Sequence, residues 1–406
     1  MEARHLRKKT MQECQFLIIG AGIIGLTLAK ELIEQGAEKI IVLEKEPQLG
    51  AHASGRNSGV LHAGIYYPPH TLKAKLCLQG NLMLQAYCEQ KGLPLVKTGK
   101  VIVARHEAEL PTLHQLYERA KENGAKVDLL DEHELAKLEP NAKTHQKALF
   151  SHYTALVDNK AILSSLQKDL QQCGRVDILF NAAFQTVQSE CVAVTSQGKI
   201  KFQQLINASG AYADKIAQQF DVGHEYYFIP FKGIYQKLTP QKAHLVNGNI
   251  YPVPNLGNPF LGVHFTKNVH GDVYVGPTAI PAFGRENYGI LQGIDKEILK
   301  IILNECVLYC MNPEFRKVAL EEPKKYFSHY FYRDAKKLVK ELQPNWLTRA
   351  TKVGIRPQLI HLRDKKLLMD FLVVQEKHTL HVLNAISPAF TSSMAFAKYV
   401  VTQYLS

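Results

Sequence analysis

The apolar positions near the start of the chain follow the order strand, turn, helix and strand. Residues 16–19 and 40–43 are unbroken apolar runs, which is typical of strands buried on both faces of a parallel sheet. Between them, residues 26–35 have the composition of a helix that ends at Gly36. The pattern predicts a β–α–β unit and therefore an α/β fold.

Glycines and one acidic residue occupy the positions at which such a unit binds a dinucleotide. Residues 20–25 form a GxGxxG run between the first strand and the helix. Gly20 permits a tight turn, Gly22 lets the backbone approach a pyrophosphate, and Gly25 lets the helix pack against the strand. Glu44 ends the second strand, where its carboxylate can accept hydrogen bonds from ribose hydroxyls and repel a 2′-phosphate. The helix N-terminus adds free N–H groups for the phosphates, so the sequence predicts a bound dinucleotide.

The rest of the chain alternates between strand–turn–helix patterns like this one and a strand-rich pattern. Residues 226–275 are rich in Tyr, Val, Phe and Gly with Pro punctuation, which favours a separate sheet beside the substrate. Further strands are expected at residues 98–104, 176–180, 191–195, 200–206, 371–375 and 379–383, and further helices at 72–90, 110–123, 131–138, 161–173, 294–311, 335–342 and towards 404. Residues 191–206 read as a hairpin around Gln197 and Gly198.

No linker or repeat separates these regions, so we expect interleaved domains rather than domains in series. A Rossmann-type cofactor domain would take residues 12–92, 147–220 and 345–406. A substrate domain with a mixed sheet would take residues 93–146 and 221–344. The predicted fold class is α/β, with the two domains interleaved along the chain.

The composition favours a globular protein without a membrane span. The 406 residues are 46% hydrophobic and 21% charged, as in ordinary globular proteins, and no apolar run approaches the ~20 residues of a membrane span. The seven cysteines are scattered without a CxxC motif, so we expect a reducing compartment, no disulfide framework and no metal site. The residues before Met11 are basic and lack the apolar core of a secretory signal, and they predict a dispensable extension or a misplaced start.

The net charge of +12 comes from dispersed Lys and Arg residues. No dense basic stripe or RNA-reading aromatic motif accompanies it, so we expect no nucleic-acid partner. A weak attraction to anionic lipid stays open. We expect a cytoplasmic protein, with peripheral contact at the inner face of a membrane as an alternative and a mitochondrial location less favoured.

Several motifs resemble one family. The Gly-, Ser- and Asn-rich loop at residues 50–67, together with residues 207–211 and 386–393, resembles the D-amino-acid-oxidase-like superfamily of FAD-dependent oxidoreductases. Within it, residues 54–67 are similar to those of L-2-hydroxyglutarate oxidases and dehydrogenases, as are residues 231–235, 250–254, 259–267 and 275–279. The resemblance extends from residue 14 to the C-terminus.

The resemblance implies a cofactor and a set of residues that hold it. The cofactor is FAD, with the polar loop lining its pyrophosphate and flavin, and with the start of the last helix facing the flavin pyrimidine edge rather than serving only as a helix cap. The implied cofactor-binding residues are Gly20, Gly22, Ile24, Gly25, Glu44, Lys45, Ser54, Arg56, Asn57, Ser58, Ala208, Ser209, Gly210, Gly354, Pro388, Ala389, Phe390 and Thr391.

The resemblance also implies a reaction. L-2-hydroxyglutarate would be oxidised to 2-oxoglutarate by hydride transfer to flavin N5, and the flavin would be reoxidised by a membrane quinone or by oxygen. His62 would accept the hydroxyl proton, with His264 as second choice. The two carboxylates of this small dicarboxylate would be held by Lys232, Arg356, Tyr235 and Tyr251. Related proteins often carry Arg at the position of Lys232, and Lys lacks the bidentate fork of Arg.

Other functions remain open at this stage. The same fold could oxidise glycerol-3-phosphate or an amino acid. A flavin domain acting on tRNA is a more distant alternative, which would show steep salt dependence in RNA binding. A non-catalytic flavin carrier is the least favoured, because it would not need buried cations in the substrate sheet.

Overall fold

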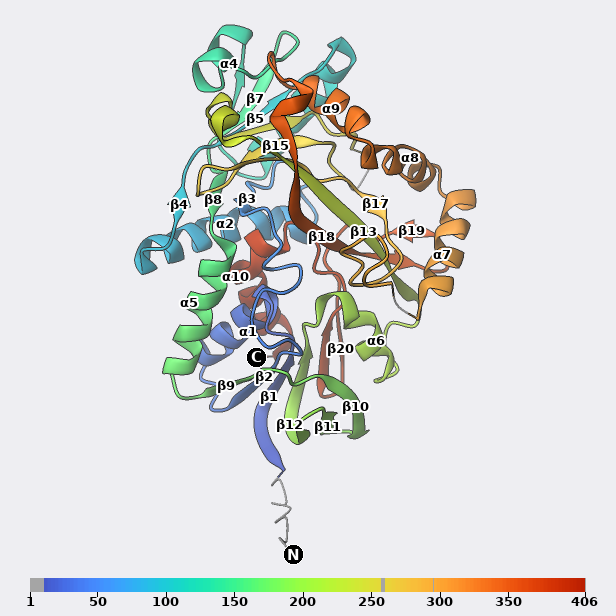
Figure 1. The fold of residues 1–406 in the computed structure, drawn as a ribbon. Helices are drawn as coiled ribbons and strands as arrows, with labels where there is room; N and C mark the ends of the chain where they lie inside the picture. The colour runs from blue at the N-terminus through green and yellow to red at the C-terminus, as the bar shows by residue number, and fades with distance from the viewer. Residues whose placement is uncertain (1–10, 257–259, 295, 406) are drawn as a thin grey trace, which may run out of the picture.

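The computed structural model describes residues 11–256, 260–294 and 296–405, so the extension expected before Met11 lies outside the described residues. Two large sheets dominate the molecule, with the first at the bottom of Figure 1 and the second above it. A small three-stranded sheet lies beside them, formed by β3 (Val60–Leu61), β8 (Ala155–Val157) and β4 (Leu95–Val96). The fold class is the predicted α/β class.

The first sheet is the parallel core that the apolar runs predict. Its central strand β1 (Gln12–Ile19) pairs in parallel with β2 (Ile40–Leu43) on one side and β12 (Gly198–Asn207) on the other. The sheet is extended by β9 (Val176–Leu179), β21 (Thr379–Val382), β20 (Val373–Glu376), β11 (Val192–Thr195) and β10 (Phe184–Ser189). β11 and β12 pair in antiparallel order, which confirms the predicted hairpin.

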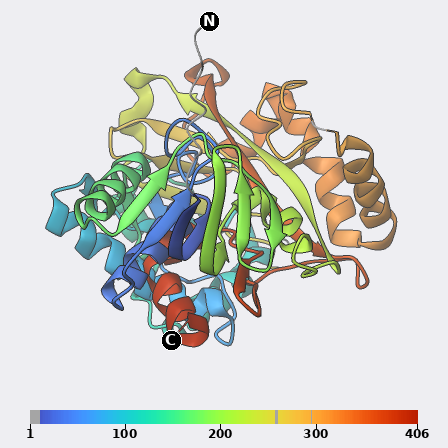
Figure 2. The ribbon, with the colours of Figure 1, turned by 90° about the horizontal axis from the view of Figure 1, so that it is seen from below.

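Helices from three parts of the chain cover this sheet and build one hydrophobic core. They are α1 (Ile23–Glu34), α2 (Leu72–Lys91), α5 (Asn159–Gln172) and α10 (Ala389–Val400), which continues as a short π-helix over Val401–Leu405. Figure 2 shows the blue strands of this sheet beside the green ones, with the red C-terminal helix next to them. The last helix of the chain therefore packs against α1, the first.

The second sheet is mixed and centres on two long strands. β13 (Tyr226–Leu238) and β18 (Leu347–His361) pair in antiparallel order along most of their length. The other strands are β19 (Lys366–Leu367), β16 (Val273–Gly276), β15 (His264–Lys267), β14 (Asn249–Pro252), β5 (Lys100–Val103), β7 (Ala148–Ser151), β6 (Val127–Leu130) and β17 (Ile280–Pro281).

A further set of helices lies around the second sheet. They are α3 (Leu110–Glu122), α4 (Glu132–Leu138), α7 (Ile298–Met311), α8 (Pro313–Glu321) and α9 (Ser328–Lys336), while α6 (Ala213–Gln218) follows β12. The helix expected at residues 335–342 is wrong, because α9 ends at Lys336 and Val339 forms a β-bridge with Ala142. None of the described helices combines the length and the apolar character needed to cross a bilayer.

Sheet membership bears on the expected domain boundaries. β7 and β18 belong to the second sheet, although both begin just beyond the boundaries expected at residues 146 and 344. The chain leaves the second sheet only after these strands, because their pairing with β5 and β13, and not local composition, decides where they lie. A division by sheets would therefore place both boundaries later, and the interleaved arrangement stays our proposal.

Candidate active site

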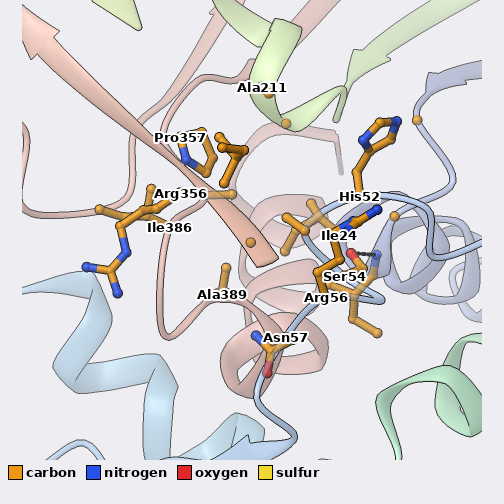
Figure 3. A pocket seen from close by; sticks show the side chains of 18 of the residues that line it. Ile24, His52, Ser54, Arg56, Asn57, Ala211, Arg356, Pro357, Ile386 and Ala389 are labelled. Carbon is orange, nitrogen blue, oxygen red and sulfur yellow. Dashed lines mark hydrogen bonds between the residues drawn. The ribbon is translucent and has the colours of Figure 1, made fainter. Parts of the chain in front are cut away.

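A cavity of about 610 Å³ lies between the two sheets, within the range of cofactor and ligand sites. One end is lined by the glycine turn after β1, and the other by β13 and β18. Figure 3 shows Arg356 at one side of this cavity and His52 at the other, with Ala389 at the start of α10 between them. The cavity thus joins the predicted nucleotide turn to the predicted substrate sheet.

The glycine turn has the backbone geometry that its sequence predicts. Gly20 has φ +104°, and a Cβ there would lie 2.7 Å from the Ala208 carbonyl oxygen. A Cβ on Gly25 would lie 1.9 Å from the Gly20 carbonyl oxygen, so the start of α1 can approach the turn only without a side chain. Gly22 faces the Ser54 hydroxyl, which accepts a hydrogen bond of 3.0 Å from the Ile23 N–H. The polar loop therefore closes over the N-terminus of α1.

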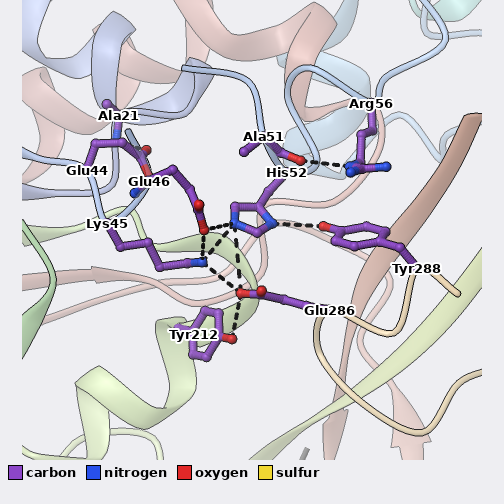
Figure 4. Close-up of polar contacts among 10 residues, drawn as sticks. All are labelled: Ala21, Glu44, Lys45, Glu46, Ala51, His52, Arg56, Tyr212, Glu286 and Tyr288. Atoms are coloured by element: carbon purple, nitrogen blue, oxygen red, sulfur yellow. Dashed lines mark hydrogen bonds and ion pairs between the residues drawn. The ribbon is translucent and has the colours of Figure 1, made fainter. Parts of the chain in front are cut away.

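Glu44 is fixed at the carboxyl end of β2 by two backbone hydrogen bonds. Its Oε2 accepts from the Ala21 N–H at 3.3 Å, and its Oε1 accepts from the Glu46 N–H at 3.0 Å (Figure 4). The carboxylate lines the cavity. This is the position that a ribose-binding carboxylate occupies in the dinucleotide fold.

A polar cluster connects the loop after β2 to the segment before α7 (Figure 4). Lys45 Nζ lies 2.8 Å from Glu286 Oε1 and 2.8 Å from His52 Nε2, and it also pairs with Glu46. His52 Nδ1 lies 2.9 Å from the Tyr288 hydroxyl. The side chains of Glu46, His52 and Glu286 come close enough to hold a cation, and the Lys45 ammonium lies among them.

Arg56 strengthens the same connection through a stacking contact. Its guanidinium carbon lies 3.8 Å from the centre of the Tyr288 ring, a distance at which cation–π attraction is effective. Its Nε and Nη1 donate to the carbonyls of Ala51 and Val353 at 2.7 and 3.0 Å. Arg56 therefore holds the polar loop in shape and ties it to both neighbouring segments.

His62 lies at the other end of the cavity, held by its backbone. Its N–H donates to Thr391 Oγ1 at 3.2 Å, and its carbonyl accepts from Asn81 Nδ2 at 2.9 Å. Helices α10 and α2 thus fix its position from two sides. Burial is the main cause that holds the pKa of His62 well below its usual value, followed by the positive charge of Lys100. The imidazole is therefore neutral near pH 7 and able to accept a proton.

His264 forms a second neutral imidazole in the same region. Its Nδ1 lies 2.8 Å from the Gly262 carbonyl, which makes Nδ1 the donor and leaves Nε2 as the acceptor. Burial is the largest cause that lowers the pKa of His264, to about 4. Both predicted histidines therefore line one cavity in a form that can act as a base.

Arg356 and Lys232 are neighbours on paired strands but face different surroundings. In the register of β13 and β18, Arg356 is opposite Phe231, whereas Lys232 is opposite Ile355. Because side chains alternate along a strand, Phe231 and Arg356 share the cavity face. Lys232 Nζ instead donates to the Gly289 carbonyl at 2.6 Å, and the residue is absent from the cavity lining. The structure thus places the Lys232 amine outside the cavity lining, and the carboxylate-clamping role remains a prediction that this arrangement does not favour.

The structure brings most of the other predicted residues together. Those lining the cavity are Gly20, Gly22, Ile24, Glu44, Lys45, Ser54, Arg56, Asn57, Ser58, His62, Ala208, Ser209, Gly210, Tyr235, Tyr251, His264, Gly354, Arg356, Ala389 and Phe390. Gly25, Pro388 and Thr391 do not line it: Gly25 packs against the turn, and Thr391 holds His62.

Sequence reasoning missed several residues that surround the cavity. Tyr288 and Glu286 come from a segment without a recognisable pattern, and only the fold brings them to the polar loop. Lys100 carried a usable signal, because it opens the apolar strand β5, whose four residues are all buried. A charge in a buried strand is rare without a special role. The same reasoning singled out Lys232 and overlooked Lys100.

The donor set fits the adenosine and pyrophosphate of a flavin dinucleotide. The turn leaves no room for a Cβ at Gly20, the N-terminus of α1 faces the polar loop, and Glu44 stands at the ribose position. Together with a cavity that continues to two neutral histidines and a buried arginine, these features define a dinucleotide-dependent oxidoreductase.

The chain belongs to the FAD dependent oxidoreductase family (DAO), whose model matches residues 15–403. It is 35% identical to the mitochondrial L-2-hydroxyglutarate dehydrogenase of Bos taurus, covering 98% of this chain and 90% of that one. It is also 35% identical to the L-2-hydroxyglutarate dehydrogenase of Indibacter alkaliphilus, with 94% and 96% coverage. These relatives confirm the resemblance drawn from the motifs.

Solved structures agree with the fold. The FAD-bound, dithionite-reduced L-alpha-glycerophosphate oxidase of Mycoplasma pneumoniae superposes with a TM-score of 0.75 at 24% identity, covering 96% of this chain and 94% of that one. Glycine oxidase of Geobacillus kaustophilus gives a TM-score of 0.70 at 16% identity, with 97% and 94% coverage. At these identities the likeness shows the shared fold.

Proposed function

We propose that this protein uses FAD to oxidise L-2-hydroxyglutarate to 2-oxoglutarate. The observation that carries the proposal is one continuous cavity that connects the glycine turn and Glu44 to His62, His264 and Arg356. The near full-length similarity to L-2-hydroxyglutarate dehydrogenases supports the choice of substrate.

The protein groups divide into cofactor-holding and substrate-holding sets. Bound FAD supplies a two-electron acceptor for the hydride from the hydroxyl-bearing carbon. The turn at Gly20 and Gly22, Glu44, and the Ser54 region would hold its pyrophosphate and ribose, and the backbone at Ala389 and Phe390 would lie against its flavin end.

The residues at the reacting end of the cavity have separate roles. His62 accepts the hydroxyl proton because its lowered pKa keeps it neutral, and His264 is the second candidate. Arg356 pairs with a carboxylate, with Tyr235 and Tyr251 beside it in the wall. Positioning of the substrate against these groups would supply much of the rate.

We further propose a membrane quinone as the electron acceptor, with oxygen as the alternative. Helix α7 exposes Leu299 (79%) and Leu303 (64%), and the chain carries a net charge of +12. An exposed apolar face on a basic protein supports peripheral contact with anionic lipid. Steady-state assays with a quinone analogue and with oxygen test this choice, and a much faster reaction with oxygen would contradict it.

The test of the reaction is anaerobic mixing of the FAD-loaded protein with L-2-hydroxyglutarate. We expect rapid loss of the visible band of oxidised flavin with the L form, and no loss with D-2-hydroxyglutarate, glycerol-3-phosphate or amino acids. A yellow protein that is bleached by one of those other compounds instead would overturn the proposed substrate and leave the cofactor assignment in place.

A further inference from the structure

Lys100 is a fully buried lysine next to the candidate active site. The side chain is 1% exposed, and among the described residues no group accepts a hydrogen bond from its Nζ. The Nζ lies 4.6 Å from the ring centre of Tyr66 and 4.9 Å from that of Tyr251. Tyr251 lines the cavity and Lys100 does not, so the charge of Lys100 acts on the cavity from behind the Tyr251 ring. Buried ammonium groups without an acceptor are rare and costly.

Two further polar atoms beside Lys100 also lack partners within the described part of the chain. These are His62 Nδ1 and the Tyr66 hydroxyl, both buried. Buried polar atoms in native proteins are nearly always hydrogen-bonded. Lys100 contacts the Tyr66 ring, and its charge acts on His62. Three unsatisfied polar groups in one region therefore indicate that a bound ligand or its water completes their hydrogen bonds.

The charges around this place define the class of ligand. Titratable groups that face the region are His62, His264, Arg356, Cys77, Lys73, Tyr66, Tyr67 and Tyr251. Among the described residues lining the cavity, the carboxylates are Glu44 and Glu286, and both belong to the ribose end near Lys45. The reacting end is thus positive or neutral, which favours an anionic ligand.

We propose that Lys100 is the cation that recognises the second carboxylate of the substrate, the one remote from the oxidised carbon, and so makes this site selective for dicarboxylates. The inference rests on the proposed function. Arg356 then pairs with one carboxylate, while Lys100 acts on the other through the Tyr66, Tyr251 and His62 surroundings. Lys100 takes the role that the sequence suggested for Lys232, whose amine is held by Gly289 outside the cavity.

The test compares the binding of glutarate with that of pentanoate to the FAD-loaded protein, followed by perturbation of the flavin spectrum without turnover. The two probes have the same number of carbons and differ in one carboxylate. We expect glutarate to bind about 10- to 100-fold more tightly than pentanoate, because its second carboxylate is attracted by the Lys100 charge across a wall of low polarity. In Lys100→Met this preference should disappear, with pentanoate binding unchanged.

Lys232→Met is the matched control, because it removes a buried lysine of the same sheet, on β13, that does not line the cavity. We expect it to keep the preference for glutarate. A kinetic test runs in parallel: Lys100→Met should raise KM for L-2-hydroxyglutarate with a smaller change in kcat, and leave kcat/KM for (S)-2-hydroxypentanoate as in the wild type.

Either of two results would overturn the role of Lys100: no preference for glutarate in the wild type, or an unchanged preference in Lys100→Met. If Lys100→Met does not load FAD, Lys100→Gln replaces it, since Gln keeps a polar end without charge. The comparison of glutarate with pentanoate in the wild type needs neither variant. Failure of the proposed function looks different: glutarate preference would depend on Lys100 while L-2-hydroxyglutarate left the flavin oxidised.

Discussion

The ring of Tyr251 lies flat against the ring of His264, with centres 3.8 Å apart and planes inclined by 29°. Tyr251 comes from β14 and His264 from β15, two neighbouring antiparallel strands. The stack fixes the plane of the imidazole, and the Gly262 carbonyl fixes its tautomer. His264 therefore presents Nε2 in one defined orientation.

This stack leads to a first prediction. Tyr251→Leu removes an aromatic pair worth about 0.5–1.5 kcal/mol and frees the His264 ring to turn. We expect kcat with L-2-hydroxyglutarate to fall roughly 2- to 10-fold, while Tyr251→Phe keeps the ring and most of the activity. Stopped-flow measurement of flavin reduction checks this, and equal effects of both variants would assign the role to the hydroxyl instead.

The lowered pKa of the histidines predicts the pH dependence of the reaction. A base works only when unprotonated, so kcat/KM is lost as pH falls through its pKa. Because burial holds the pKa of His62 well below its usual value, we expect the acidic limb of kcat/KM to lie well below pH 6.5. His62→Asn should lower kcat by about 10²–10⁴-fold. An equal or larger loss in His264→Asn would move the role of base to His264.

Two glycines of the turn predict two different failures. In Gly22→Ala the new Cβ lies 3.2 Å from the Ser54 hydroxyl, a contact that the fold can accommodate. The same Cβ would occupy space that a bound pyrophosphate needs. We expect a folded protein that has lost FAD. Gly25→Ala brings a Cβ within 1.9 Å of the Gly20 carbonyl and should prevent stable folding. Circular dichroism together with the flavin-to-protein absorbance ratio separates the two, and full FAD loading in Gly22→Ala would contradict the assigned site.

These glycines also show which parts of the structure could be predicted from the sequence. The β–α–β unit and its turn were predictable because each step depends on local geometry: an apolar run, a residue without Cβ, and a carboxylate at the strand end. The face of Lys232 was not predictable, because it depends on the register between β13 and β18, which are far apart in the chain. Tyr288 was missed for the same reason, since its partner His52 is 236 residues away in the chain.

The cluster around Tyr288 predicts how long FAD stays bound. Arg56 stacks on the Tyr288 ring at 3.8 Å and His52 lies 2.9 Å from its hydroxyl, and together they hold the polar loop over the cavity. Tyr288→Leu should lose about 1 kcal/mol of this attachment and speed FAD release roughly fivefold. Tyr288→Phe keeps the ring and serves as the control. The amount of free FAD that passes an ultrafiltration membrane at successive times after dilution reports the rate, and an unchanged rate in Tyr288→Leu would show that the cluster does not retain FAD.

We expect Lys100 to lower the free energy of unfolding while it raises the selectivity of the site for dicarboxylates. Burial lowers the pKa of Lys100 to about 7, below the ordinary value of about 10.4 in an unfolded chain. Between these two pH values Lys100 is protonated in the unfolded chain but neutral in the folded protein, so the free energy of unfolding rises with pH across this window. The destabilisation caused by burying Lys100 is therefore greatest below about pH 7. Lys100→Met should therefore raise the free energy of unfolding by about 1–4 kcal/mol at pH 6.

Thermal melts of the FAD-free protein at pH 6 and pH 10 check this relation. The gain in Lys100→Met should shrink at the higher pH, where the wild-type lysine is neutral. Lys232→Met should give a smaller gain, because burial lowers the pKa of Lys232 only to about 8 and its amine donates a hydrogen bond to the Gly289 carbonyl. A destabilised Lys100→Met at pH 6 would show that the ammonium is satisfied in the ligand-free protein.

The packing of α10 against α1 and α2 has a consequence for biosynthesis. Thr391, in the last helix, holds His62, and the backbone of α10 approaches α2 so closely that a Cβ on Gly80 would lie 2.5 Å from the Thr391 carbonyl. While the chain is still on the ribosome, the glycine turn can form, but the wall at Ala389 and Phe390 is not yet available. Cofactor capture must therefore wait until the ribosome has released the chain through α10, which makes FAD a ligand of the assembled two-sheet body and not an aid to its early folding.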